Sequence, residues 1–193
     1  MGMATTLGVA GIRAPIISGL VLSLNGNGIT LSSSLWQRLQ LDSAANTYDP
    51  LVTAQALKAE MDKTDHQLTF ASVHNFSTHT LILRQWLELA GIDPDIDARI
   101  IVLPPEQMVD SLAQGVIDGF CVGEPWNSIA VEYGAGVLAT TGVRLWNGAP
   151  DKVLGVMENW HGKNPGTHLR LRLALMEACR WMADMANREQ AIQ

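Results

Sequence analysis

The chain has 193 residues, with 13 Lys and Arg against 19 Asp and Glu, and is long enough for one to one and a half domains with a buried core. Its net charge of −6 leaves no basic stripe, which excludes a direct nucleic-acid binder or a binder of anionic membranes. Its two cysteines are too few for a disulfide framework or a cysteine-based zinc site.

The first third of the chain, up to about residue 66, is rich in Gly, Ser and Asn. Its apolar stretch 16–24 is too short to span a membrane, and residues 1–10 lack the cationic start of a signal peptide. The run 25–29, Asn-Gly-Asn-Gly-Ile, is predicted as a turn and matches no phosphate-binding glycine motif. Apolar spacing predicts two helices, at 35–39 with Ser33 or Ser34 as N-cap and at 51–61.

From residue 68 onward, apolar strands alternate with amphipathic helices. This alternation predicts an α/β fold with a parallel-rich sheet flanked by helices and buried on both faces. Ligands of such sheets bind beyond the carboxyl ends of the strands. The predicted strands are 68–73, 99–103, 116–122, 137–140 and 152–157, and the predicted helices are 81–90, 106–114, 126–133 and 167–187. In the last helix we expect the following side chains in the core: Met176, Trp181, Met182 and Met185.

Residues 73–79 form the first strand-to-helix loop of interest. It offers two imidazoles, two hydroxyls, an amide and the first N–H groups of a helix, which together suit an anion. The alternative is that Ser77 or Thr78 only caps the helix. His74 and His79 are a weak metal signal, because they stand alone across a turn.

Residues 122–127 form the second loop, where Glu124 and Asn127 stand where a ligand would bind and Trp126 offers a flat wall. Glu124 would serve as a general acid or base if it faced a pocket, and otherwise begins a helix. Cys121 lies inside an apolar strand and is predicted to be a core residue. Asp93 and Asp95 flank a proline and are predicted to form a turn.

Four runs of this sequence resemble the nitrate/nitrite- and bicarbonate-binding proteins of ABC transporters, in the same order along the chain. The most specific is Gly-Glu-Pro-Trp-Asn after Phe-Cys-Val, at 120–127. The other three are 78–94 with Arg-Gln-Trp-Leu and Ala-Gly-Ile-Asp-Pro, 104–109 beginning Pro-Pro, and 151–156, Asp-Lys-Val-Leu-Gly-Val.

The resemblance implies a fold of the type II periplasmic-binding-protein class, with one small oxyanion held between two lobes and no cofactor or metal. Carried over by motif, His79 after Thr78 contacts the anion and Lys152 supplies the counter-charge. Asn27 contacts the ligand from the run 25–29, where the family usually has Gln. Glu124 is a further candidate ligand residue, and it would hold a metal if the ligand were bicarbonate.

Compared with that family, the chain looks like an internal fragment. Residues 1–65 are expected to be the C-terminal part of the first lobe, and residues 66–193 a nearly complete second lobe. A periplasmic or membrane-anchored location follows for a transporter, and a cytoplasmic one for a sensor.

The resemblance leaves several functions open. A solute-binding protein would deliver nitrate or nitrite to an ABC permease. A cytoplasmic nitrate/nitrite sensor would instead control an RNA-binding antiterminator, and the loop 73–79 departs from the usual transport pattern in that direction. Bicarbonate binding is less favoured, because the charge of Lys152 makes a metal held by Glu124 less necessary. An enzyme like the thiamine-precursor synthases is disfavoured, since their cysteine-rich motif is missing from this sequence. We therefore expect a binding protein rather than an enzyme.

Overall fold

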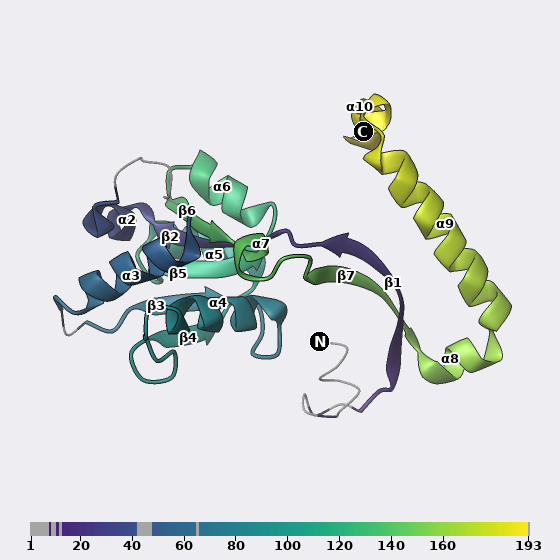
Figure 1. Ribbon diagram of the computed structural model, residues 1–193, viewed down its shortest axis with the longest axis horizontal. Coiled ribbons are helices and arrows are strands. Elements are labelled where there is room, and N and C mark those ends of the chain that lie inside the picture. The colour runs from purple at the N-terminus through teal and green to yellow at the C-terminus, as the bar shows by residue number, and fades with distance from the viewer. Residues whose placement is uncertain (1–7, 9–10, 12, 42–47, 65, 193) are drawn as a thin grey trace. The chain divides into compact units, whose positions relative to one another are not determined.

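The computed structural model describes the chain except for residues 1–7, 9–10, 12, 42–47, 65 and 193 (Figure 1). The chain divides into two compact units. One unit is continuous, Asn25–Ala149, and the other combines Met1–Leu24 with Pro150–Gln193. We call them the sheet unit and the ribbon unit and describe each by itself.

The sheet unit is built on five strands in the order β4-β3-β5-β2-β6. β3 is parallel to β4 and to β5, whereas β2 is antiparallel to β5 and to β6. The α/β class with a sheet flanked by helices is confirmed, and the sheet is mixed. The strands are β2 (Asn27–Ser32), β3 (Thr69–Ser72), β4 (Arg99–Val102), β5 (Gly119–Gly123) and β6 (Gly136–Thr141).

The prediction of a turn over 25–29 is wrong from Asn27 onward. Only Asn25 and Gly26 turn, with φ of 62° and 90°, and β2 then runs through the middle of the sheet with all six residues buried. The sequence Asn-Gly-Asn-Gly at 25–28 favours a turn, and it hid the short alternation of Ile29 and Leu31 with polar residues that follows.

Helices cover both faces of this sheet (Figure 1). One core layer surrounds Trp86, Phe70 and Leu57, and the other surrounds Phe120 and Met108. The helices are α2 (Ser33–Leu39), α3 (Pro50–Met61), α4 (Thr78–Glu88), α5 (Pro105–Ala113), α6 (Trp126–Glu132) and α7 (Gly142–Leu145). The first of them begins at Ser33 rather than at the expected residue 35, because Ser32 is its N-cap and accepts a hydrogen bond from Leu35 N at 3.2 Å.

The ribbon unit consists of two antiparallel strands followed by helices. β1 (Ile16–Leu24) pairs with β7 (Pro150–Met157). The predicted helix 167–187 begins earlier and ends at Ala183. The remaining elements are α8 (Glu158–Lys163), α9 (Pro165–Ala183), a 3-10 turn (Met185–Asn187) and α10 (Arg188–Ile192). No described helix of the chain combines the length and apolar character needed to cross a membrane.

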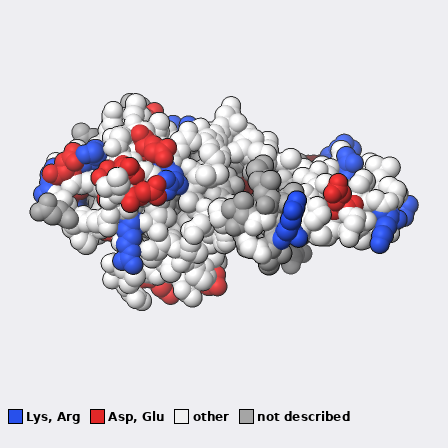
Figure 2. Space-filling view, turned by 90° about the horizontal axis from the view of Figure 1, so that it is seen from below, with Lys and Arg blue, Asp and Glu red and all other residues white. Residues whose placement is uncertain are grey.

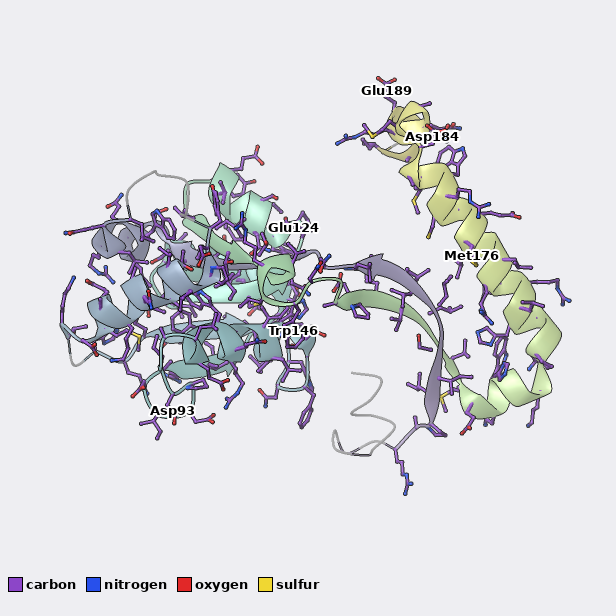
Figure 3. All side chains as sticks on the ribbon, viewed as in Figure 1. Asp93, Glu124, Trp146, Met176, Asp184 and Glu189 are labelled. Carbon is purple, nitrogen blue, oxygen red and sulfur yellow. The ribbon has the colours of Figure 1, made fainter. Side chains whose placement is uncertain are left out.

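The prediction that the apolar side chains of the last helix lie in a core is wrong for this chain. Met176 projects from α9 (Figure 3) and is 43% exposed. Among the described residues of α9, only His168 is buried, because only one face of the helix packs against β1. The others expected in the core are exposed as well: Trp181 by 41%, Met182 by 56% and Met185 by 71%.

The units part after residues 24 and 149 rather than at 65/66. The reason is β2, which pairs with β5 on one side and β6 on the other and so joins residues 27–32 to the sheet. These units of the chain do not test the assignment of 1–65 and 66–193 to two lobes of a longer protein, which stays a prediction. On the face drawn in Figure 2, acidic and basic side chains lie intermixed rather than in a stripe of one sign.

Candidate functional site

A niche lies where β5 ends and β2 begins. Gly123, the last residue of β5, is the cross-strand partner of Asn27, the first residue of β2. A Cβ placed on Gly123 would lie 3.5 Å from Asn27 Oδ1 and 3.7 Å from His79 Nε2. The structure therefore brings two of the predicted site residues together around one glycine, which sequence reasoning had not singled out. A glycine that ends a buried strand is the signal that would have found it.

Asn27 is only 5% exposed, and its Oδ1 has no hydrogen-bond partner among the described residues. A buried polar group left without a partner costs about 1–3 kcal/mol. A buried atom without a partner calls for an explanation, and a bound molecule that hydrogen-bonds to it is one. The unpartnered Oδ1 therefore favours a polar ligand in the niche.

The first turn of α4 forms another wall of the niche. Ser77 is its N-cap and accepts from Thr80 N at 3.3 Å, so the interpretation of a capping residue is confirmed. The Thr80 hydroxyl donates to His74 O at 2.8 Å, which fixes the loop before the helix. Thr78 and His79 occupy the first two helical positions, where the partial positive charge of the helix favours an anion.

Glu124 adjoins the niche in sequence, but its side chain is exposed. Its Oε2 accepts from Ser128 N at 3.2 Å and from Ser128 Oγ at 2.8 Å, and so caps the start of α6. The interpretation that this residue begins a helix is thereby supported, and its carboxylate is engaged there.

Asn127 has a structural role in this fold, and its role toward a ligand stays a prediction. It is 1% exposed, accepts from Thr30 Oγ1 at 2.8 Å and donates to Val122 O at 2.9 Å. Both ends of its amide are therefore used to hold β2, β5 and α6 together.

Lys152 lies in β7 of the ribbon unit. Its side chain is 67% exposed and forms an ion pair with Asp151. The proposed role of this lysine as a counter-charge stays a prediction, since it belongs to the other unit.

Two further sequence predictions can be placed. Cys121 is fully buried, as expected, and burial raises the pKa of its thiol far above the ordinary value. His74 Nδ1 accepts from Phe76 N at 3.1 Å. Within the described part of the chain, no cluster of three or more His, Cys, Asp or Glu side chains could hold a metal ion.

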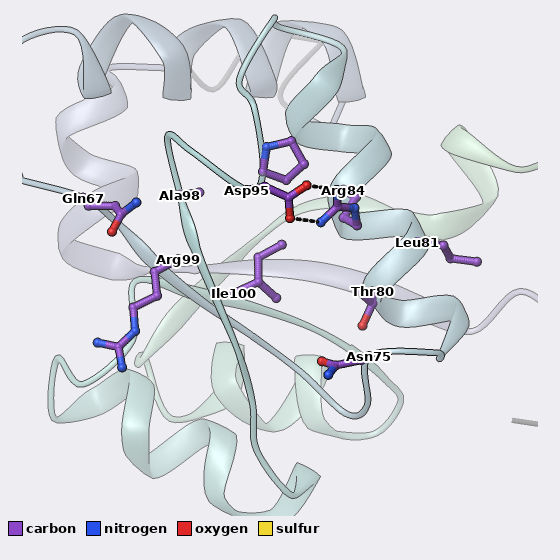
Figure 4. Close-up of a pocket in the computed structure, with 10 residues that line it drawn as sticks. Gln67, Asn75, Thr80, Leu81, Arg84, Asp95, Ala98, Arg99 and Ile100 are labelled. Atoms are coloured by element: carbon purple, nitrogen blue, oxygen red, sulfur yellow. Dashed lines mark hydrogen bonds and ion pairs between the residues drawn. The ribbon is translucent and has the colours of Figure 1, made fainter. Parts of the chain in front are cut away.

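A separate cavity of about 660 Å³ lies beside β4, one of the two edge strands of the sheet (Figure 4). Arg84 of α4 donates to both carboxylate oxygens of Asp95 there, at 2.8 and 2.6 Å. The hydrogen bond from this guanidinium lowers the pKa of the Asp95 carboxyl. Asp95 N also donates to Asp93 Oδ1 at 2.9 Å, which confirms the predicted turn. Asn75 of the loop 73–79 lines this cavity, whereas the ligand residues carried over by resemblance do not.

Comparisons with known proteins agree on one family. The family model described as "NMT1-like family" matches residues 1–193. The nitrate import ATP-binding protein NrtC of Synechocystis sp. (strain ATCC 27184 / PCC 6803 / Kazusa) is 42% identical over 194 residues, which are 100% of this chain and 27% of that protein. The bicarbonate transport ATP-binding protein CmpC of Synechococcus elongatus (strain ATCC 33912 / PCC 7942 / FACHB-805) is 43% identical over 180 residues, 93% of this chain and 26% of that protein.

Among solved structures, the crystal structure of the periplasmic nitrate-binding protein NrtA from Synechocystis PCC 6803 is similar with a TM-score of 0.85 and 31% identity. The match covers 98% of this chain and 47% of that chain. This chain therefore spans about a quarter of the two curated relatives and about half of the solved one.

Proposed function

Because this chain belongs to the NMT1-like family and has the α/β fold of a periplasmic nitrate-binding protein, we propose that it is a solute-binding module of an ABC-type uptake system. Its ligand in this proposal is a small oxyanion, nitrate or nitrite, and the module binds rather than catalyses. The observation that carries the proposal is the convergence of Asn27 and His79 on Gly123.

The residues of the niche have the chemistry that an oxyanion requires. The start of α4 supplies backbone N–H groups and a favourable dipole, worth about 0.3–1 kcal/mol and up to about 2 when partly buried. His79 presents Nε2 and Asn27 presents an amide at the same spot. Lys152 remains the proposed counter-charge. As a test of that role, Lys152→Ala is expected to abolish binding.

The same fold suggests how the chain is organised in the longer protein. We assign Asn25–Ala149 as one complete lobe, in place of the expected 66–193, because this segment contains the whole five-stranded sheet. β1 and β7 would then lead to the other lobe. A periplasmic location and an ABC permease as partner belong to this proposal.

The test is calorimetry of the 193-residue chain with nitrate, comparing the wild type with Gly123→Ala. The added methyl group would stand in the niche at ordinary contact distances of 3.5–3.8 Å, so the fold should tolerate it while the anion is excluded. Gly162→Ala is the matched control, because its Cβ would have nothing within 4 Å. Nitrate affinity that is equal in all three proteins would overturn the proposal.

A second candidate is favoured by the ATP-binding relatives, which resemble this chain over nearly its whole length. In this case the module is one part of a polypeptide that also carries an ATP-binding domain. The reading frame around the gene distinguishes the two candidates, since an ATP-binding motif in the same frame supports the second. Co-purification with an RNA-binding antiterminator and no transport subunit would instead support the sensor alternative.

A further inference from the structure

The amide of Asn27 has a property that the oxyanion function does not by itself require. We propose that the Asn27 amide can hydrogen-bond to an anion with or without a proton, so that one niche accepts both nitrate and hydrogencarbonate. This inference rests on the oxyanion function proposed above and specifies which anions that site takes.

The two anions differ in hydrogen-bonding chemistry although both are planar, trigonal and singly charged. Nitrate can only accept hydrogen bonds, whereas hydrogencarbonate accepts through two oxygens and donates through its O–H. An asparagine side chain carries an acceptor, Oδ1, and a donor group, Nδ2, of nearly equal size. Turning the amide by half a rotation exchanges the two atoms at one place.

Two buried asparagines of this chain differ in what their amide oxygens contact. Asn127 is held at both ends, by Thr30 Oγ1 at 2.8 Å and Val122 O at 2.9 Å, so a half rotation would break both hydrogen bonds. Asn27 Oδ1 is buried without a partner, and turning costs no hydrogen bond at that atom. The residue is 5% exposed, so water does not substitute freely for the missing partner.

The position of the unpartnered oxygen directs it at the ligand. It faces the space above Gly123, where a side chain would otherwise stand, and His79 Nε2 faces the same space. An O–H of hydrogencarbonate placed there satisfies Oδ1 directly. For nitrate the amide turns and donates Nδ2–H to an anion oxygen, while the α4 N-terminus and His79 meet the remaining oxygens in both cases.

Calorimetry of the 193-residue chain with nitrate and with hydrogencarbonate tests the role of Asn27, first on the wild type and then on a variant. At a pH where hydrogencarbonate is the main carbonate species, the wild type should bind both anions with affinities within about tenfold, because the amide offers one hydrogen bond to either. Asn27→Leu should weaken both by about 10–100-fold, the loss of a hydrogen bond to a charged group.

Asn27→Asp should make nitrate affinity depend on pH, which a purely structural role of Asn27 would not predict. The protonated acid donates to nitrate and the ionised acid repels it, so nitrate affinity relative to the wild type should rise as pH falls. Asn147→Asp is the matched control, since Asn147 is exposed and should leave the ratio flat. Circular dichroism confirms that each variant is folded.

The outcomes separate the two proposals. Suppose that the wild type binds nitrate more than about 100-fold tighter than hydrogencarbonate and that Gly123→Ala abolishes binding. This result overturns the role of Asn27 and leaves the oxyanion function intact. Equal nitrate affinity in the wild type and Asn27→Leu does the same. A folded wild type that binds neither anion overturns the oxyanion function and this inference with it.

Discussion

The two units of this chain differ in how they bury apolar surface. Every buried hydrophobic residue among the described ones lies in the sheet unit, between Ile29 and Ala139. In the ribbon unit, large apolar side chains such as Leu169 and Met182 are 53% and 56% exposed. Burial of apolar surface is the dominant favourable contribution to folding, so residues 25–149 supply most of the stability of the chain.

The ribbon unit is held together by other contacts. β1 and β7 pair along their length, and α9 packs onto β1 at His168, which is 3% exposed. His168 Nδ1 and His161 Nδ1 lie 2.8 Å apart and join α8 to α9. Polar and steric contacts of this kind are sensitive to single substitutions and to pH, whereas a large apolar core is sensitive mainly to loss of volume.

The largest expected effect is in the core of the sheet unit. Trp86 is fully buried, packs edge-on against Phe70 and donates from Nε1 to Thr53 Oγ1 at 3.1 Å. Trp86→Ala should lower the free energy of unfolding by about 3–5 kcal/mol, measured by urea denaturation. Trp181→Ala, at a position 41% exposed on α9, is the matched control and should cost far less. Similar losses for both tryptophans would contradict the comparison.

The next effect should be confined to the ribbon unit. A Cβ on Gly19 of β1 would lie 2.8 Å from His168 Cε1 and 3.3 Å from Arg172 Cδ, so these side chains, and α9 with them, must give way. Overpacking of this kind costs about 1–3 kcal/mol. Gly19→Ala should therefore speed amide hydrogen exchange in α9 and leave the sheet unit unchanged.

Gly162→Ala, whose Cβ meets nothing within 4 Å, serves as the control for hydrogen exchange in the Gly19 variant. Unchanged exchange in α9 of the Gly19 variant would show that the contact between His168 and β1 does not hold the helix.

Sequence patterns predicted most of the sheet unit because its elements keep regular periods. The helices around Trp86 and Met108 and the strand β5 were found from apolar spacing and from proline and glycine at their ends. β2 was missed because it is short and begins within the run Asn-Gly-Asn-Gly, whose residues are typical of turns. Its position between β5 and β6 depends on pairings with residues far along the chain, which no local pattern encodes.

The site was partly predictable. The sequence indicated His79 from a strand-to-helix loop, and Asn27 came only from the resemblance. It could not show that their side chains meet at Gly123, because β2, α4 and β5 are distant in sequence and adjacent only in the folded sheet. Nor could it distinguish Asn127, which is engaged by Thr30 and Val122, from Asn27, whose Oδ1 has no described partner.

A pH dependence should also separate the units. Burial lowers the pKa of the His168 imidazole, and the neighbouring His161 and Arg172 lower it further. The unfolded state then binds the proton more tightly, so the stability linked to His168 is complete above the ordinary histidine pKa of about 6.5 and is lost as pH falls through the folded value. β1 contributes no titratable group to this contact.

Hydrogen exchange across this pH range should therefore show α9 losing protection in acid before the strands of the sheet unit do. His168→Gln, which cannot gain the charge, should flatten the response of α9. If α9 and β5 lost protection together, the acid effect would be global and the histidine pair would have no local role.

The smallest expected effect provides the sharpest test of the comparison. Asn25 N donates to Ala149 O at 2.8 Å, so the two ends of the sheet unit lie side by side. Residues 25–149 expressed alone should retain the urea midpoint of the sheet transition in the whole chain, because no buried hydrophobic residue is removed. The control is the same segment carrying Trp86→Ala, which should lose about 3–5 kcal/mol as it does in the whole chain. A clear fall in the midpoint on excision would mean that the ribbon unit stabilises the sheet through contacts other than apolar burial.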